Sequence, residues 1–409
     1  MPSSPLAPPP SPLPPPPHLS PPLLALSLSS SFGPVQVLSR RVNGIGEITL
    51  NRPKALNALS TEMVTLLLSA YRDFSSGAVS AVVLKGAGAK AFCAGGDVKR
   101  VVELIGEGKW REGMNFFTIE YEVDYLIHTL PVPHIAILNG ITFGGGVGLS
   151  VHGAFQVATE KSLFAMPECA IGLYPDVGGS YFLSRLKKDG VGRYLGLTGA
   201  RLKGADLVRA GVATHYLPSS ELSRLEEALQ ALGGRAADFD AVRGLLDRLQ
   251  SDASPNGLPP GTFEGDEPHI KRVFGDGASS VVEIHRRLRE AAQAGDGSSL
   301  AAFAQRALKS IGDGSPTSQA ITFEQIRRGA QLPSLAACLT MEHGMMTRML
   351  QQKDSDFVEG VTQKLITKTN KPSWKHTSVE DVPEAQVQAF FEPLQLGSQL
   401  VLGGAQAKL

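Results

Sequence analysis

The sequence contains few cysteines and no long apolar run. Its 409 residues include three cysteines, far apart and without CxxC spacing, so neither a disulfide framework nor a zinc site is expected. No stretch approaches the roughly 18 to 20 consecutive apolar residues that a membrane-spanning helix needs. Lysine plus arginine equals aspartate plus glutamate at 39 each. A chain without net charge gives no electrostatic reason to expect nucleic acid or an anionic membrane as its partner.

Proline is concentrated at the N-terminus. Residues 1–34 hold 13 of the 28 prolines and no lysine, arginine, aspartate or glutamate. Proline favours extended, unpacked chain, so we expect a disordered extension and leave open whether it has a targeting role. The chain as a whole is 42% hydrophobic, which is normal for a globular protein with a sizeable core.

From residue 35 onward, strand and helix signals alternate. Apolar runs flank the turn pair Asn43-Gly44, which predicts a hairpin, and Ser60 is the expected N-cap of a helix over 63–71. Short strands are expected at 81–84, 134–138 and 155–158, with helices between them. Beyond Pro218 the strand signals fade, and amphipathic helices are expected at 222–232, 238–249, 279–292, 300–311 and 335–352. We predict an α/β core over 35–220, a helical part of the same catalytic unit over 221–375, and a tail over 376–409.

Two glycine-rich loops begin where short strands end. They read Ala91-Phe-Cys-Ala-Gly-Gly-Asp97 and Asn139-Gly-Ile-Thr-Phe-Gly-Gly-Gly-Val-Gly148. Glycine lets the backbone approach a ligand closely, and N–H groups from two loops could form an oxyanion hole for a carbonyl that gains charge. Tight turns or close helix packing would also explain each loop taken singly. Neither loop has the spacing of a dinucleotide-binding motif.

Two carboxylates follow the second loop in an otherwise apolar segment. Glu168 and Asp176 lie eight positions apart, and each directly follows a proline, so rigid turns hold both side chains. Burial would raise their pKa toward values useful in acid–base catalysis. On spacing alone, helix capping explains Asp176 equally well. Glu120, on a predicted helix, has by itself the pattern of a solvated helix acid.

These motifs occur together, and in this order, in one family. The chain resembles the crotonase superfamily, and within it the 3-hydroxyisobutyryl-CoA hydrolase branch, from about residue 36 to 374. The resemblance rests on the glycine loops, on Gly172-Leu-Tyr-Pro-Asp-Val-Gly-Gly179, on Asp356-Phe-Val-Glu-Gly360, and on segments 48–59, 158–168, 197–204 and 314–318. It implies a crotonase-like spiral of ββα units with a helical C-terminal portion. It also implies hydrolysis of 3-hydroxyisobutyryl-CoA to 3-hydroxyisobutyrate and coenzyme A, a step of valine breakdown.

The resemblance assigns expected roles to individual residues of this sequence. Glu168 matches the catalytic glutamate of the superfamily, and Asp176 matches the aspartate typical of the hydrolase branch. The backbone N–H groups of Gly96 and Gly145 fall where the family's oxyanion hole lies. Glu120 matches a substrate-contacting acid, which replaces the interpretation as a solvated helix acid.

Other positions bear on coenzyme A binding and on the type of reaction. Lys54 and Ala55 lie in the segment that, in this superfamily, runs past the phosphates and adenine of coenzyme A. Enoyl-CoA hydratases of the superfamily carry a second glutamate two residues beyond the glycine triplet, where this chain has Gly148, which favours hydrolysis over hydration. The family's Glu-Tyr-Arg and Asp-Lys-Asp are replaced by Glu342-His343-Gly344 and Thr367-Lys368-Thr369. We expect both departures to lie away from the catalytic motifs.

Two alternatives stay open: a hydrolase or hydratase for another short acyl-CoA, and a non-catalytic structural subunit that keeps the fold. The resemblance implies an acyl-CoA substrate and no metal, redox cofactor, nucleic acid or membrane partner, and it leaves a homo-oligomer open. The chain ends in Ala407-Lys408-Leu409, a variant of the Ser-Lys-Leu peroxisomal signal. We therefore expect a peroxisomal location, with the mitochondrion as the alternative.

Overall fold

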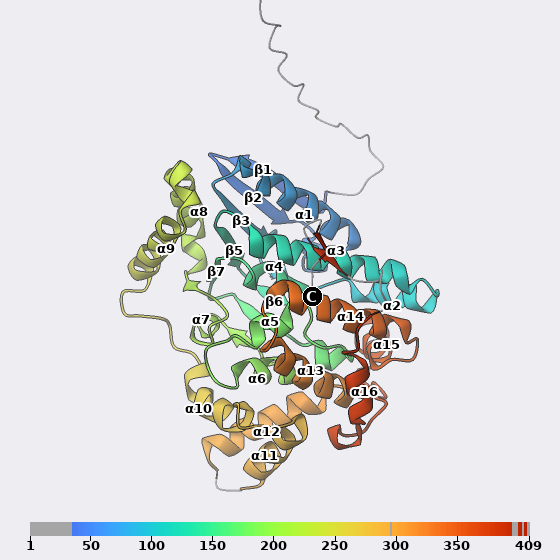
Figure 1. Cartoon of the computed structure of the whole chain (residues 1–409). Coiled ribbons are helices and arrows are strands. Elements are labelled where there is room, and N and C mark those ends of the chain that lie inside the picture. Colours follow the sequence, from blue (N-terminus) through green and yellow to red (C-terminus); the bar gives the residue numbers. More distant parts are fainter. Residues whose placement is uncertain (1–34, 295–296, 395–399, 403–404, 407–409) are drawn as a thin grey trace, which may run out of the picture. The chain divides into compact units, whose positions relative to one another are not determined.

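A computed structural model describes residues 35–294, 297–394, 400–402 and 405–406, which are drawn in colour in Figure 1. The expected disorder of residues 1–34 and the C-terminal Ala-Lys-Leu both lie outside the described residues.

Six strands form the larger sheet, in the order β1-β2-β3-β5-β7-β10. They are β1 (Val37–Val42), β2 (Ile45–Leu50), β3 (Ala81–Gly86), β5 (His134–Leu138), β7 (Phe155–Ala158) and β10 (His215–Tyr216). β1 and β2 are antiparallel, and the other neighbours are parallel. The predicted hairpin is confirmed, because Asn43 and Gly44 join β1 to β2 with φ of 49° and 82°, the positive values that this turn pair favours.

The chain passes repeatedly between this sheet and a smaller one. The smaller sheet has the order β4-β6-β8-β9 and consists of β4 (Ala91–Cys93), β6 (Ile141–Phe143), β8 (Leu163–Ala165) and β9 (Leu202–Lys203). β3 leads to β4, β5 to β6, and β7 to β8, so each passage gives one strand to each sheet. Helices α2 (Val98–Gly106) and α3 (Trp110–Thr129) follow β4, and α4 (Gly145–Val151) follows β6. This is the predicted spiral of ββα units.

Apolar side chains cover both faces of the larger sheet, as expected for parallel strands. Side chains alternate along β3: Val82 and Leu84 join the main core with α1 (Thr61–Asp73) and α3, whereas Val83 faces α8 (Leu222–Leu232) and α9 (Phe239–Ala253). In Figure 1 these two pairs of helices lie on opposite sides of the sheet. Helix α1 begins at the predicted N-cap, since the Ser60 hydroxyl accepts a hydrogen bond from the Met63 N–H at 3.2 Å.

The second half of the described chain is mostly helical. After α8 and α9 come α10 (Phe263–Phe274), α11 (Val281–Gln293), α12 (Ser299–Gly312), α13 (Pro316–Gly329), α14 (Leu335–Gln351), α15 (Asp356–Val361) and α16 (Glu384–Ala389). The expected helices correspond to α8, α9, α11, α12 and α14, but α10, α13, α15 and α16 were not predicted. Val387 and Phe390, in the segment expected to be a weakly structured tail, are buried in the main core.

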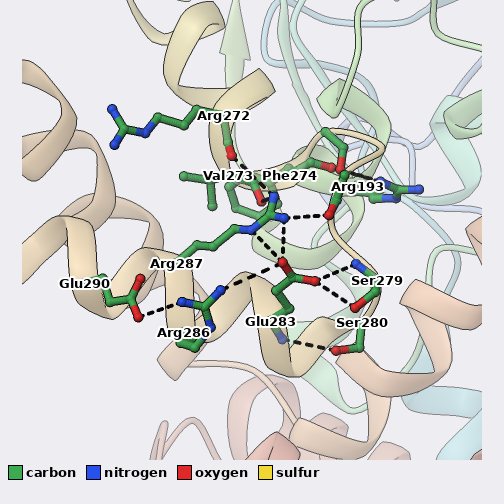
Figure 2. A network of polar contacts seen from close by, with 12 residues as sticks. Arg193, Arg272, Val273, Phe274, Ser279, Ser280, Glu283, Arg286, Arg287 and Glu290 are labelled. Atoms are coloured by element: carbon green, nitrogen blue, oxygen red, sulfur yellow. Dashed lines mark hydrogen bonds and ion pairs between the residues drawn. The ribbon is translucent and has the colours of Figure 1, made fainter.

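The joint between α10 and α11 is fixed by a network of polar contacts (Figure 2). The Glu283 carboxylate accepts hydrogen bonds from the backbone N–H of Ser279 at 2.8 Å and from its hydroxyl at 2.7 Å. The same carboxylate accepts two bonds from Arg287 one turn further along α11. Arg193 of α6 (Val191–Thr198) donates to the Gly275 carbonyl at 2.7 Å. The joint is therefore tied both to α11 and to the α/β part.

Candidate active site

The two glycine loops lie side by side because their strands are paired. β4 and β6 are parallel neighbours, so both loops leave the smaller sheet at the same edge. A Cβ placed on Gly95 would lie 3.8 Å from the Gly145 nitrogen. A bridge between Leu59 and Gly96, with Leu59 N–H bonded to the Gly95 carbonyl at 2.8 Å, fixes the first loop. Among the described residues, no backbone acceptor receives a hydrogen bond from the N–H of Gly96 or Gly145.

Glycine has two distinct uses in the second loop. A Cβ on Gly146 would lie 2.5 Å from the Cys93 carbonyl oxygen, so this glycine allows α4 to pack closely on β4. Gly144 has φ 46° and ψ −119°, a conformation that only glycine adopts readily. Gly145 is the first residue of α4, where the helix dipole adds positive potential to its N–H. The second loop thus uses glycine for close packing at Gly146 and to present a free N–H group at Gly145.

Glu168 lies against the second loop. A Cβ placed on Gly144 would be 2.8 Å from Oε1 of Glu168, next to the free N–H of Gly145. The side chain is buried, and its Oε2 has no hydrogen-bond partner among the described residues. Burial raises the pKa of Glu168 well above its ordinary value, and the nearby charge of Asp176 raises it further.

Glu120 points into the same place from α3 and is not a solvated acid. Its side chain is 1% exposed, and a Cβ on Gly145 would lie 2.3 Å from its Oε1. That oxygen has no partner in the described part of the chain. Burial raises the pKa of Glu120 well above its ordinary value, with further contributions from Asp176 and Glu168. The structure therefore brings Glu120, Glu168 and both loops together.

Asp176 is also buried in this group and does not cap a helix. Helix α5 (Gly179–Leu183) begins after Gly178 without a side-chain cap, so the capping interpretation is wrong. Oδ2 of Asp176 accepts a hydrogen bond from the Tyr121 hydroxyl at 3.2 Å. Burial, followed by the charge of Glu342, raises the pKa of Asp176 to about 7. The next residue, Val177, is buried at φ 52°, a left-handed conformation that a β-branched side chain rarely adopts.

Sequence reasoning missed two further buried acids. Asp124 lies one helical turn beyond Glu120, and neither of its oxygens has a partner among the described residues. The spacing of four between Glu120 and Asp124 could have indicated a shared helix face. Glu342 was expected to lie away from the catalytic motifs, and this expectation is wrong. Its carboxylate accepts hydrogen bonds at 2.8 Å from the N–H groups of Gly178 and Ser180, directly after Asp176.

The residues expected to bind coenzyme A lie on the surface, unlike the buried acids. Lys54 and Ala55 are exposed on a short 3-10 helix, Pro53–Ala55. Their segment is bonded to the first glycine loop, since Arg52 pairs with Asp97 at 3.7 Å. They therefore lie outside the buried group of acids but on a segment that touches the Gly96 loop.

Two further observations complete the description of the site. Within the described ranges, no helix is long and apolar enough to cross a membrane. No cluster of histidine, cysteine, aspartate and glutamate side chains in the same ranges has an arrangement that could hold a metal ion.

Comparison with known proteins agrees with the fold. Residues 45–391 match the family model of enoyl-CoA hydratase/isomerase, and the chain belongs to this family, the crotonase superfamily. Among solved structures, an enoyl-CoA hydratase from Rhodobacter sphaeroides has a TM-score of 0.78 at 33% identity, covering 90% of this chain and 100% of that one. The predicted crotonase fold is therefore confirmed.

Several curated relatives are hydrolases. 3-Hydroxyisobutyryl-CoA hydrolase 1 of Arabidopsis thaliana is 40% identical, with 90% of this chain and 94% of the relative covered. The mitochondrial 3-hydroxyisobutyryl-CoA hydrolases of Danio rerio and Homo sapiens are 42% and 40% identical, covering 90% and 88% of this chain and 92% and 89% of their own lengths. The chain is thus similar over most of its length to enzymes of the branch that its motifs resemble.

Proposed function

We propose that this protein hydrolyses 3-hydroxyisobutyryl-CoA to 3-hydroxyisobutyrate and coenzyme A. The observation that carries the proposal is the position of Glu168. Oε1 of this buried carboxyl lies against Gly144, next to the free N–H of Gly145, and its Oε2 has no partner in the described part of the chain. The family implies an acyl-CoA substrate, and the relatives named above are hydrolases of this thioester.

The thioester carbonyl binds between the N–H groups of Gly96 and Gly145. These donors stabilise the negative charge that develops on the carbonyl oxygen, and loss of one such donor raises the barrier by about 3 to 4 kcal/mol. Glu168 acts in one of two ways: it removes a proton from the attacking water, or it attacks the carbonyl itself to give a mixed anhydride that water then opens. In both routes the C–S bond breaks, water supplies the new carboxylate oxygen, and the thiolate leaves with a proton.

The acids beside Glu168 select the acyl group and handle the leaving group. Oε1 of Glu120 is unpartnered and adjacent to Gly145, so it is available to the substrate's acyl part. Asp176 bonds the 3-hydroxyl and donates a proton to the thiolate, a role that suits a carboxyl with a pKa of about 7.

The packing around Gly148 supports hydrolysis rather than hydration. A Cβ at this position would lie 2.6 Å from the Cβ of Val177 and 2.9 Å from both oxygens of Asp124. The second glutamate of the hydratases therefore has no room here.

A thiol-release assay on 3-hydroxyisobutyryl-CoA tests this function. Wild type should release coenzyme A, and Glu168→Gln should lower kcat by roughly 10²- to 10⁴-fold. Glu324→Gln is the matched control, since Glu324 is a buried glutamate of α13 that pairs with Arg327 and Arg328. If wild type released no coenzyme A from this substrate, the proposal would be wrong. Water addition to crotonyl-CoA would instead favour a hydratase, and inactivity on all acyl-CoA substrates would favour a structural subunit.

We also propose a peroxisomal location, on the basis of Ala407-Lys408-Leu409. The relatives from Danio rerio and Homo sapiens are mitochondrial enzymes, which makes the mitochondrion the second candidate. A fluorescent protein fused to the C-terminus should abolish peroxisomal import, whereas an N-terminal fusion should preserve it. Mitochondrial fluorescence of the C-terminal fusion alone would support the second candidate.

A further inference from the structure

The turn that carries Asp176 is held from outside by a residue of α14. Glu342 is 0% exposed, and its carboxylate accepts bonds from the N–H groups of Gly178 and Ser180 at 2.8 Å each and from the Ser180 hydroxyl at 2.5 Å. The Gln325 amide of α13 donates to the same carboxylate at 3.3 Å and to the Pro175 carbonyl at 2.6 Å. Helices α13 and α14 lie beside α5 in Figure 1, so the far half of the chain fixes this turn.

The turn needs such a constraint because its backbone is strained. Val177 has φ 52° and Gly178 has φ 77°, and a non-glycine residue in a sparsely populated region persists only where its surroundings hold it. Nε2 of His152 donates to the Val177 carbonyl at 2.7 Å, while Glu342 binds the amides that follow. His152 and Glu342 therefore bind the carbonyl and the N–H of the peptide that joins Val177 to Gly178.

We propose that Glu342 is a positioning residue, whose carboxylate holds the Asp176–Val177–Gly178 turn in place and whose negative charge keeps the Asp176 carboxyl protonated. This inference rests on the proposed function of Asp176. Glu342 is the first residue of the Glu342-His343-Gly344 triplet. It is far from Asp176 in the sequence, but it contacts the segment that carries Asp176.

The number of hydrogen bonds decides which of the two acids carries the charge. Glu342 accepts four bonds, from two backbone N–H groups, one hydroxyl and one amide, whereas Asp176 accepts one, from Tyr121. Bonds donated to a carboxylate favour its charged form. Burial, followed by the charge of Glu342, raises the pKa of Asp176 to about 7. Burial also raises the pKa of Glu342 to about 7, but its hydrogen bonds act in the opposite direction. We therefore place the charge on Glu342 and the proton on Asp176.

Other titratable groups also face Asp176. From α3 they are Glu120, Tyr121 and Asp124; Glu168 and Tyr174 face it from its own segment, and His152 lies at the end of α4. The acids among them raise its proton affinity in the same direction as Glu342 when they are ionised. Glu342 differs from them because its hydrogen bonds favour the ionised form.

The test compares the pH dependence of kcat/KM in wild type, Glu342→Gln and Glu342→Asp, with Glu324→Gln as the control. In wild type, activity should fall as Asp176 loses its proton near pH 7. Glu342→Gln removes the charge, so this descending limb should move to lower pH by roughly one unit. Glu342→Asp keeps the charge, so its limb and that of the control should stay at the wild-type pH. An unmoved limb in Glu342→Gln, or an equal shift in Glu342→Asp, would overturn the electrostatic part.

Hydrogen exchange tests the positioning part without relying on activity. The amides of Gly178 and Ser180 are bonded to a buried carboxylate, so they should exchange slowly in wild type and at least about tenfold faster in Glu342→Leu, whose side chain has no acceptor. Amides of α9 serve as an internal reference for global stability. Unchanged protection at Gly178 and Ser180 would overturn the positioning role. If wild type released no coenzyme A while exchange behaved as expected, the proposed function would be wrong. The positioning role of Glu342 would still be supported.

Discussion

Replacing Gly148 by alanine tests whether the packing of this site excludes a side chain where hydratases carry a glutamate. Gly148 is buried inside α4. An added Cβ would lie 2.6 Å from the Cβ of Val177, and ordinary contacts between carbon atoms are about 3.5 to 4.0 Å. A Cβ is fixed to the backbone and cannot rotate away, so about 1 Å of overlap has to be relieved by moving α4 or the Asp176 turn.

The expected effect follows from the cost of overpacking. Inserting a methyl group into a well-packed core destabilises a protein by about 1 to 3 kcal/mol. The matched control is Gly244→Ala, because Gly244 lies inside α9 with nothing within 4 Å of an added Cβ. That change should stabilise by about 0.5 to 1 kcal/mol. The two glycine-to-alanine variants should therefore differ by about 1.5 to 4 kcal/mol in the free energy of unfolding.

Urea denaturation and the thiol-release assay give the two readouts. Gly148→Ala should unfold at lower urea than wild type, and its kcat should fall about 10- to 100-fold, because a small displacement of Asp176 disturbs the reacting geometry. Val177→Gly removes the atom that the new methyl group meets, so the double variant should recover part of both losses. Gly148→Glu should gain no hydration of crotonyl-CoA. Wild-type stability and activity in Gly148→Ala, or new hydratase activity in Gly148→Glu, would refute the reasoning.

Three other outcomes follow from single contacts. Ser60→Ala removes the N-cap of α1 and should lower stability by about 1 kcal/mol in urea melts; an unchanged midpoint would show that water replaces the cap. Cys93, Cys169 and Cys338 are all buried, and burial raises the pKa of their thiols to about 12, 12 and 11. Native protein should therefore not react with a thiol reagent, whereas denatured protein should show three reactive thiols. Reaction of the native protein would contradict this expectation. Bonds from Ser279 and Arg287 lower the pKa of Glu283 to about 2 from its ordinary 4.5, so its stabilising effect exists above pH 4.5 and disappears as the pH falls toward 2. Melting curves of Glu283→Gln and wild type should therefore converge on acidification. The change should be small, because Glu283 is only partly buried and solvent screens its interactions.

Local signals predicted the parts of the fold that depend on neighbouring residues. The hairpin at Asn43-Gly44 and the cap at Ser60 are fixed by backbone preferences within a few positions. Helix α13 was missed because most of its side chains are buried, so it has no polar face and no amphipathic pattern. Helix α10 carries Pro268 and few apolar residues, which weakens its helical signal.

The same division applies to the site. Glu168, Asp176 and the glycine loops lie within one stretch of sequence, so their motifs could be read directly. Glu342 reaches the site through the packing of α14 on α5, and no sequence spacing encodes that contact. Asp124 is separated from Glu120 by one turn of α3, so the two acids share a helix face. The sequence does not indicate whether that face is buried or exposed to solvent.

Burial acts similarly on the acids of this site, but hydrogen bonding does not, and the difference controls where charge can reside. Glu342 accepts four bonds, whereas Oε1 of Glu120, Oε2 of Glu168 and both oxygens of Asp124 have no partner among the described residues. An unpartnered buried carboxylate is far more costly than a neutral carboxyl. We therefore expect the resting charge at the α14 end, away from the N–H groups of Gly96 and Gly145. Under the proposed function, Glu168 has to lose its proton for turnover. We expect this to be tolerable only while Glu120 and Asp124 keep theirs, so that one negative charge lies beside the carbonyl that is attacked.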